Sequence, residues 1–239
     1  MIKTLAQGFC DLLYPHNCII CQKYLKGHLK TDIFCPGCRS LWIANPPPFC
    51  VVCPRHCLKP GSCCSDCHRR PPFFDRAWSA FLYEGPLRRL LHEFKYGQKT
   101  FLRHEFGKAL IDFVQTYALP IESHDYIIPI PLHSTRLRER GYNQAQLLAE
   151  MIGRRFELPL LSNRLLRRHF TRYQATVKPK ERWTNLKGAF TISQPRELFG
   201  KSVLLVDDLL TTGATVSEAA LLLKMAGARR VDVLTLAVA

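Results

Sequence analysis

From residue 77 onward, the spacing of apolar residues alternates between that of helices and that of strands. In PLRRLLHEFKYG, residues 86–97, apolar residues recur every three or four positions before a glycine, which predicts an amphipathic helix. We expect further helices over residues 101–117, 143–156 and 212–227. Short apolar runs predict strands in WSAFLYEG, DYIIPIPL, GKSVLLVDD and RRVDVLTLAVA. This alternation favours an α/β fold with a parallel sheet and helices on its faces.

The chain before residue 73 has a different composition, because it holds all 11 cysteines. Eight of them form four Cys-x-x-Cys knuckles, which are Cys18/Cys21, Cys35/Cys38, Cys50/Cys53 and Cys64/Cys67. Two knuckles together present four thiolates, the ligand set of a closed structural zinc site. The proline-rich segment RRPPFFD at 69–75 marks a hinge. We therefore expect a zinc-binding module over residues 1–72 and a second domain over residues 73–239.

The sequence leaves the pairing of the knuckles open. The 13 residues between the first two knuckles and the 10 between the last two favour sequential pairing and two zinc ions. A cross-braced arrangement, in which the first knuckle joins the third, is the alternative. Cys63, His56 and His68 are candidate substitute ligands, whereas Cys10 and Cys57 have no assigned partner. Because four thiolates leave no open coordination position, the expected role of zinc is structural.

Two adjacent carboxylates follow the most apolar predicted strand. Asp207 and Asp208 come directly after the aliphatic run VLLV, and ligands of parallel sheets bind beyond the carboxyl ends of strands. The next turn, residues 211–215, combines threonine hydroxyls with Gly213, which tolerates a positive φ, and it leads into a helix whose first amides attract anions. The stretch thus offers two carboxylates for vicinal hydroxyls and a nest for a phosphate. A ribose 5-phosphate carries both groups.

The formal charge of +15 indicates an acidic partner, such as a phosphate, a nucleic acid or an anionic membrane face. Part of the excess lies in residues 129–190, which hold 13 Lys or Arg against 4 Asp or Glu. The sequence has no apolar run of about 18 residues, and its start lacks the pattern of a signal peptide, so we expect a cytoplasmic protein. In a reducing compartment the cysteines favour metal over a disulfide scaffold.

Residues 203–215 resemble the phosphoribosyl-pyrophosphate (PRPP) signature of type I phosphoribosyltransferases. In that family the acidic pair binds the ribose 2- and 3-hydroxyls, and the following loop holds the 5-phosphate. The resemblance therefore implies PRPP binding at Asp207, Asp208, Leu209, Thr211, Thr212, Gly213, Ala214 and Thr215. It also implies Mg²⁺ bound together with PRPP.

The larger arrangement is similar to the ComF competence family, which includes the GntX-like proteins. The similarity is carried by the knuckles and by motifs that include KYG at 95–97, IPIPL at 128–132, RERGYNQ at 138–144 and ERWTNLKGAF at 181–190. Tyr142 stands where a typical member has phenylalanine. The resemblance implies a type I phosphoribosyltransferase-like sheet with flanking helices, preceded by a small zinc-ribbon-like module. It also implies a part in DNA uptake or natural transformation, with internalised single-stranded DNA and other DNA-processing proteins, such as a helicase-like ATPase, as partners.

A second set of polar residues follows the strand in DYIIPIPL. In the superfamily the loop at this place binds pyrophosphate, and an arginine fork matches phosphate oxygens. The candidates are Arg140, Gly141, Asn143 and Gln144. For Arg136 and Arg138, a solvated position at the start of a helix is as consistent with the sequence as a role in binding pyrophosphate. If ribosyl transfer occurs, Asp207, Asp208 and Arg140 are the catalytic candidates.

The stretch from residue 165 to residue 183 mixes basic and aromatic residues without clear periodicity. It has three interpretations: a mobile loop that closes over PRPP, a surface for single-stranded nucleic acid, or an ordinary amphipathic segment. The candidates for nucleic-acid contact are Arg167, Arg168, Arg172, Tyr173, Lys178, Lys180 and Arg182. Two functional hypotheses follow: a phosphoribosyltransferase with an unidentified acceptor, or a binding module that senses PRPP and holds DNA. A nucleotide-salvage enzyme is a weaker third.

Overall fold

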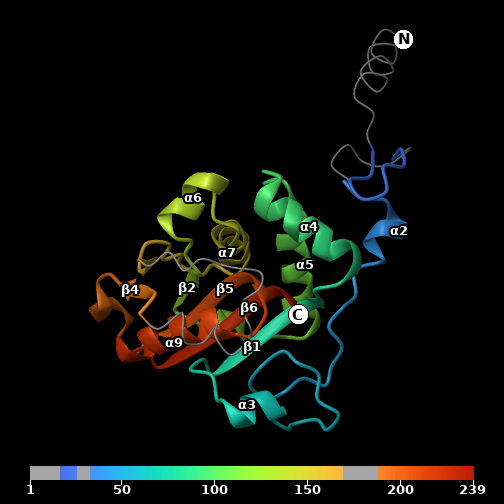
Figure 1. Ribbon diagram of the computed structural model, residues 1–239. Helices are drawn as coiled ribbons and strands as arrows, with labels where there is room; N and C mark the ends of the chain where they lie inside the picture. Colours follow the sequence, from blue (N-terminus) through green and yellow to red (C-terminus); the bar gives the residue numbers. More distant parts are fainter. Residues whose placement is uncertain (1–16, 26–32, 169–187) are drawn as a thin grey trace.

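The computed structural model describes residues 17–25, 33–168 and 188–239. In this part of the chain, four parallel strands form a sheet with the order β1-β6-β5-β2 (Figure 1). They are β1 (Arg76–Leu82), β2 (Tyr126–Pro129), β5 (Ser202–Leu210) and β6 (Arg230–Val238). The two central strands, β5 and β6, are buried along most of their length, as expected for a parallel sheet covered on both faces. The predicted α/β fold with a parallel sheet is confirmed.

Helices cover the two faces of the sheet (Figure 1). One face packs against α4 (Gly85–Tyr96), α5 (Leu102–Thr116) and α7 (Gln144–Arg155). The other face packs against α9 (Ala214–Met225). Beside α9 lies a two-stranded antiparallel sheet formed by β3 (Leu165–Arg167) and β4 (Phe190–Ile192). The apolar periodicity correctly predicted α4, α5, α7 and α9, because each of these helices buries one side against the sheet.

The shorter elements were not anticipated from the sequence. They are the helices α2 (Pro36–Arg39), α3 (Ser65–Arg69) and α6 (Ser134–Arg140), the strands β3 and β4, and the 3₁₀ turns η1 (Ile121–Ser123) and η2 (Pro195–Leu198). Strand β5 is also longer than expected, because its pairing with β6 continues to Leu210. Asp207 and Asp208 therefore lie within the last four residues of the strand rather than after it.

The cysteine-rich part forms two lobes on opposite sides of the sheet. Near α2, Ile19, Ile20 and Phe34 pack with the helices of the first face. Near α3, Val52 packs against the apolar cluster of the second face. The intervening segment follows β1, where Leu82 N donates to Ile43 O at 2.9 Å and Asn45 N donates to Ala80 O at 2.9 Å. Figure 1 shows this segment running from α2 to α3 beside the sheet.

A close approach of α5 and α7 depends on Gly107. A Cβ atom at this position would lie 2.8 Å from Met151 Cβ and 2.9 Å from its Cγ, so α7 would have to move. We expect Gly107→Ala to lower the free energy of unfolding by about 1–3 kcal/mol, although alanine favours helices. Urea denaturation measures this loss. Gly37→Ala is the control, because no atom lies within 4 Å of its Cβ position, and an equal effect of both substitutions would contradict the close approach.

Candidate functional site

The acidic pair of β5 is compensated by a lysine from α4. Asp208 is 6% exposed, and Lys95 Nζ lies 2.9 Å from its Oδ2. Burial acts to lower the pKa of Lys95, but the charge and hydrogen bond of Asp208 and the charge of Asp207 together outweigh it. The pKa is therefore raised, and Lys95 stays charged. Burial, together with the Asp208 charge, raises the pKa of Asp207 to about 8. The pair is therefore short of positive charge, and a bound cation or hydroxyl donors would stabilise it.

The loop after β5 has the geometry of an anion nest. Gly213 has a φ of +76° and stands immediately before the first residue of α9, so its conformation favours glycine. Gly213 has no side chain that could cap the first turn of α9. The neighbouring Thr212 Oγ1 accepts a hydrogen bond from Ala214 N at 3.4 Å. Thr211 and Thr215 are half-buried in the same turn. This arrangement can hold a phosphate with amides and hydroxyls.

Arg140 is fixed at the end of α6. Its two terminal nitrogens donate to Gln144 Oε1 and to Tyr96 Oη, each at 3.1 Å, and its guanidinium lies 4.7 Å from the centre of the Tyr96 ring. Gly141 follows with a φ of +77° and ends the helix. Asn143 caps α7, because its Oδ1 accepts from Ala145 N, and its Nδ2 donates to Ile130 O. The structure thus gives Asn143 a role in linking α7 to the end of β2.

A cavity of about 190 Å³ lies beside Arg140 and Lys95, the lysine that pairs with Asp208. Its lining consists of Lys95, Tyr96, Gln98, Arg136, Glu139 and Arg140. Three of these side chains are cationic and one is acidic, which suits a small anion of more than one negative charge. Sequence reasoning did not assign a role to Lys95 or Tyr96, although the KYG motif at residues 95–97 was the available signal.

Two residues of the RERGYNQ motif hold the end of α4 in place. Tyr142 Oη donates to Phe94 O at 2.6 Å, and Gln144 Nε2 donates to Phe94 O and to Lys95 O at 3.3 and 3.4 Å. These bonds satisfy carbonyls at the helix end that have no partner within the helix. The tyrosine hydroxyl, absent from a phenylalanine, therefore contributes to the placement of Lys95.

Of the nucleic-acid candidates, Arg167 and Arg168 are in the described part of the chain. Burial and the Arg136 charge lower the pKa of Arg167, and the Asp207 charge opposes them, so Arg167 shares the electrostatic environment of the acidic pair. Arg168 is exposed, and its amide donates to Ala189 O at 2.9 Å beside the β3–β4 sheet. The other candidates, Arg172, Tyr173, Lys178, Lys180 and Arg182, lie outside the described residues.

The eight knuckle cysteines form two tetrads, Cys18/Cys21/Cys35/Cys38 and Cys50/Cys53/Cys64/Cys67. Within each tetrad all sulfurs lie within 4.8 Å of one another. Two of the separations are 3.7 Å, for Cys21 and Cys35, and 3.6 Å, for Cys53 and Cys64. Tetrahedral zinc with Zn–S bonds of about 2.3 Å places its sulfurs about 3.8 Å apart, so the donor sets fit zinc. Sequential pairing is confirmed, and the cross-braced alternative is wrong.

The segment around the second tetrad contacts α9 and the loop that begins it. Arg55, which follows Cys53, forms an ion pair with Asp66 of α3, and its other terminal nitrogen donates to Thr211 O at 3.4 Å. Asp66 also accepts from Arg69 at 2.6 Å. Phe73 N donates to Ser217 Oγ of α9 at 3.0 Å. A change in the second tetrad would therefore reach the anion nest through direct contacts.

Comparison with known proteins identifies the class of the C-terminal part. Residues 164–238 match the phosphoribosyl transferase domain family, and they include β5, the acidic pair and the anion nest. In the part of the chain that the structure describes, no helix has the length and apolar character needed to span a bilayer.

The relatives extend the similarity over most of the chain. It is 31% identical to Competence protein F of Haemophilus influenzae, over 94% of this chain and 97% of the relative. It is 31% identical to DNA utilization protein YhgH of Salmonella typhi, over 93% and 96%. Competence protein ComFC of Bacillus subtilis is 30% identical over 78% and 75%. The chain belongs to the ComF family of competence proteins.

The tetrads predict two zinc ions per chain. We expect Cys64→Ser to reduce the zinc content from about two ions to about one after dialysis against a mild chelator, because a three-thiolate site binds zinc less tightly. Elemental analysis of the purified protein measures the content. Cys63→Ser is the matched control, because the neighbouring Cys63 lies outside the tetrad. Loss of an ion from the control would contradict the assigned ligands.

The raised pKa of Asp207 predicts a pH-dependent effect on stability. A carboxyl whose pKa rises from 3.8 to about 8 on folding destabilises the native state increasingly as the pH rises between these values. We expect Asp207→Asn to be more stable than the natural protein, by an amount that grows from pH 5 to pH 8. Urea denaturation at several pH values tests this, with the exposed Asp112→Asn as the control. A difference independent of pH would refute the raised pKa.

Proposed function

We propose that this chain binds PRPP at the carboxyl ends of β5 and β2 and takes part in the use of DNA taken up by the cell. The observation that carries the proposal is the acidic pair of β5, in which Asp208 is buried and Asp207 half-buried, followed by the positive-φ Gly213 at the start of α9. This arrangement lies within the residues that match the phosphoribosyl transferase domain family.

Each part of the site has a partner group on PRPP. Asp207 and Asp208 would accept hydrogen bonds from the ribose 2- and 3-hydroxyls. The backbone and hydroxyls of residues 209–215 would hold the 5-phosphate at the start of α9. The cations of the 190 Å³ cavity, with Arg140 held by Tyr96 and Gln144, suit the pyrophosphate.

Magnesium fits the same site, because the acidic pair lacks positive charge and Mg²⁺ prefers carboxylate and phosphate oxygens. When bound, Mg²⁺ neutralises part of the charge of the pyrophosphate. Lys95 and Arg140 would stabilise the remaining charge.

Ribosyl transfer is the second candidate function. The cation-lined cavity beside the acidic pair supports it, since departure of pyrophosphate from the anomeric carbon leaves negative charge at that place. The protein would position the ribose and stabilise the leaving group, so no covalent nucleophile is required. The acceptor is not specified by any residue set in the described part of the chain. Such transfer would make the protein a phosphoribosyltransferase of nucleotide metabolism.

The DNA part of the proposal rests on the relatives and on the charge of the chain. The names of the relatives refer to competence and to DNA utilization. The formal charge of +15 is suited to single-stranded DNA, and the exposed Arg168 is one candidate contact. We extend the proposal to the division of the chain at residue 72, with the cysteine lobes as one part and the PRPP-binding domain as the other.

Calorimetry with PRPP tests the binding site. We expect zinc-loaded protein to bind PRPP more tightly with Mg²⁺ than without it, and the Asp207→Asn/Asp208→Asn variant to lose at least about tenfold in affinity because the hydroxyl acceptors are gone. Asp112→Asn is the control for loss of a carboxylate elsewhere. Unchanged affinity of the double variant would refute the site. Pyrophosphate release by the same samples with a panel of nucleobases separates transfer from binding.

A further inference from the structure

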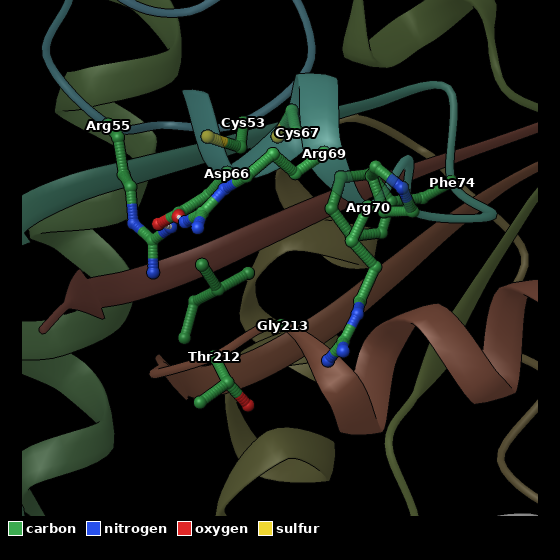
Figure 2. Close-up of a pocket in the computed structure, with 11 residues that line it drawn as sticks. Cys53, Arg55, Asp66, Cys67, Arg69, Arg70, Phe74, Thr212 and Gly213 are labelled. Atoms are coloured by element: carbon green, nitrogen blue, oxygen red, sulfur yellow. Dashed lines mark hydrogen bonds and ion pairs between the residues drawn. The ribbon is translucent and has the colours of Figure 1, made fainter. Parts of the chain in front are cut away.

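A larger cavity, of about 390 Å³, lies between the second tetrad and the loop that begins α9 (Figure 2). Its polar lining consists mainly of Arg55, Asp66, Arg69, Arg70, Thr212 and Gly213. Pro72, Phe74 and Leu210 supply apolar surface. We call this cavity the knuckle pocket. It is separate from the 190 Å³ cavity at Arg140, since no lining residue is shared between the two.

The knuckle pocket has three guanidinium groups in its lining. Asp66 and the Cys53 and Cys67 thiolates of the second tetrad supply the negative charge that these groups balance. Asp66 forms ion pairs with Arg55 and with Arg69, so this carboxylate holds both guanidinium groups in place. In Figure 2 these groups lie on the loop side of Cys53 and Cys67, and Arg70 extends toward Gly213 and the start of α9. The positive end of the α9 dipole adds to the same field.

The shape and chemistry of the knuckle pocket fit a nucleotide. Guanidinium forks match phosphate oxygens, and arginine is favoured over lysine where a phosphate is bound by two parallel hydrogen bonds. A volume of 390 Å³ falls in the range of small-molecule sites, about 300–1,000 Å³, and exceeds what a phosphate ion needs. The apolar side formed by Pro72, Phe74 and Leu210 can contact a sugar or a base.

We propose that the knuckle pocket binds the phosphate of a nucleotide, either free or within a single strand, beside the anion nest. The second cysteine lobe then has a binding role in addition to its structural one. The inference that the ligand is a nucleotide rests on the proposed function in DNA use. The inference that an anion binds in this pocket does not depend on PRPP binding.

The test compares two pairs of arginines. Arg69→Gln/Arg70→Gln removes two guanidinium groups from the pocket at the end of α3. Arg154→Gln/Arg155→Gln removes the same charge from two exposed residues at the end of α7, which packs on the opposite face of the sheet. The probes are a fluorescent oligo-dT strand, followed by anisotropy, and thymidine monophosphate, followed by calorimetry. Zinc content and circular dichroism verify that both variants are folded.

We expect the pocket variant to bind at least one probe about tenfold or more weakly than the control variant. The slope of strand affinity against salt should also fall by about 0.7 for each phosphate that the variant no longer neutralises. Loss for the strand alone assigns the ligand to single-stranded DNA, and loss for both probes assigns it to nucleotides generally. Equal weakening in the two variants, or no binding of either probe by the natural protein, overturns the proposal. So does arginine-dependent binding of phosphatidylglycerol vesicles without effect on the nucleotides.

The Asp207→Asn/Asp208→Asn variant separates this inference from the proposed function. Its substitutions lie outside the lining of the knuckle pocket, so it should lose PRPP affinity but keep its affinity for the strand within about twofold. If the natural protein does not bind PRPP but the strand result holds, the proposed PRPP site fails and the knuckle pocket stands.

Discussion

The ion pair between Lys95 and Asp208 makes the rest of the site possible. Two neighbouring carboxylates near the end of a buried strand repel each other and lose hydration, and the raised pKa of Asp207 reflects both effects. Lys95 offsets part of this cost from the end of α4. Its place depends in turn on Tyr142 and Gln144, which bind the last carbonyls of that helix. The RERGYNQ and KYG motifs and the acidic pair are therefore one connected unit, although they are far apart in the sequence.

The sequence predicted the elements whose pattern is set by burial. Strands β5 and β6 are continuous apolar runs, and α4, α5, α7 and α9 each bury one face, so local spacing was sufficient. Helix α6 has no buried residue, and β3 and β4 have three residues each, so they leave little periodicity to detect. The Lys95–Asp208 pair joins distant positions, and no local pattern encodes it. The knuckle spacing was compatible with two pairings, and only the three-dimensional arrangement distinguished them.

The two cysteine lobes have different relations to the site. The first lobe packs with α5, where Arg39 forms an ion pair with Glu105 at 3.0 Å, and it lies on the face away from α9. The second lobe reaches the anion nest through the hydrogen bond from Arg55 to Thr211. This division places one cysteine tetrad beside the core helices and the other beside the loop that begins α9.

Irregular segments of the chain cover the outer edges of both edge strands, β1 and β2. Residues 43–45 bond to β1, and beside β2 Ile127 exchanges hydrogen bonds with Pro159 O and Leu161 N. Within the described residues, neither margin offers a free ladder of amides and carbonyls to another molecule. Residues 43–45, which pair with β1, are held in place by a cysteine lobe on each side. Loss of metal would release them and expose the edge of β1 to pairing with a second chain. Zinc bound in the tetrads would then limit self-association as well as support the fold.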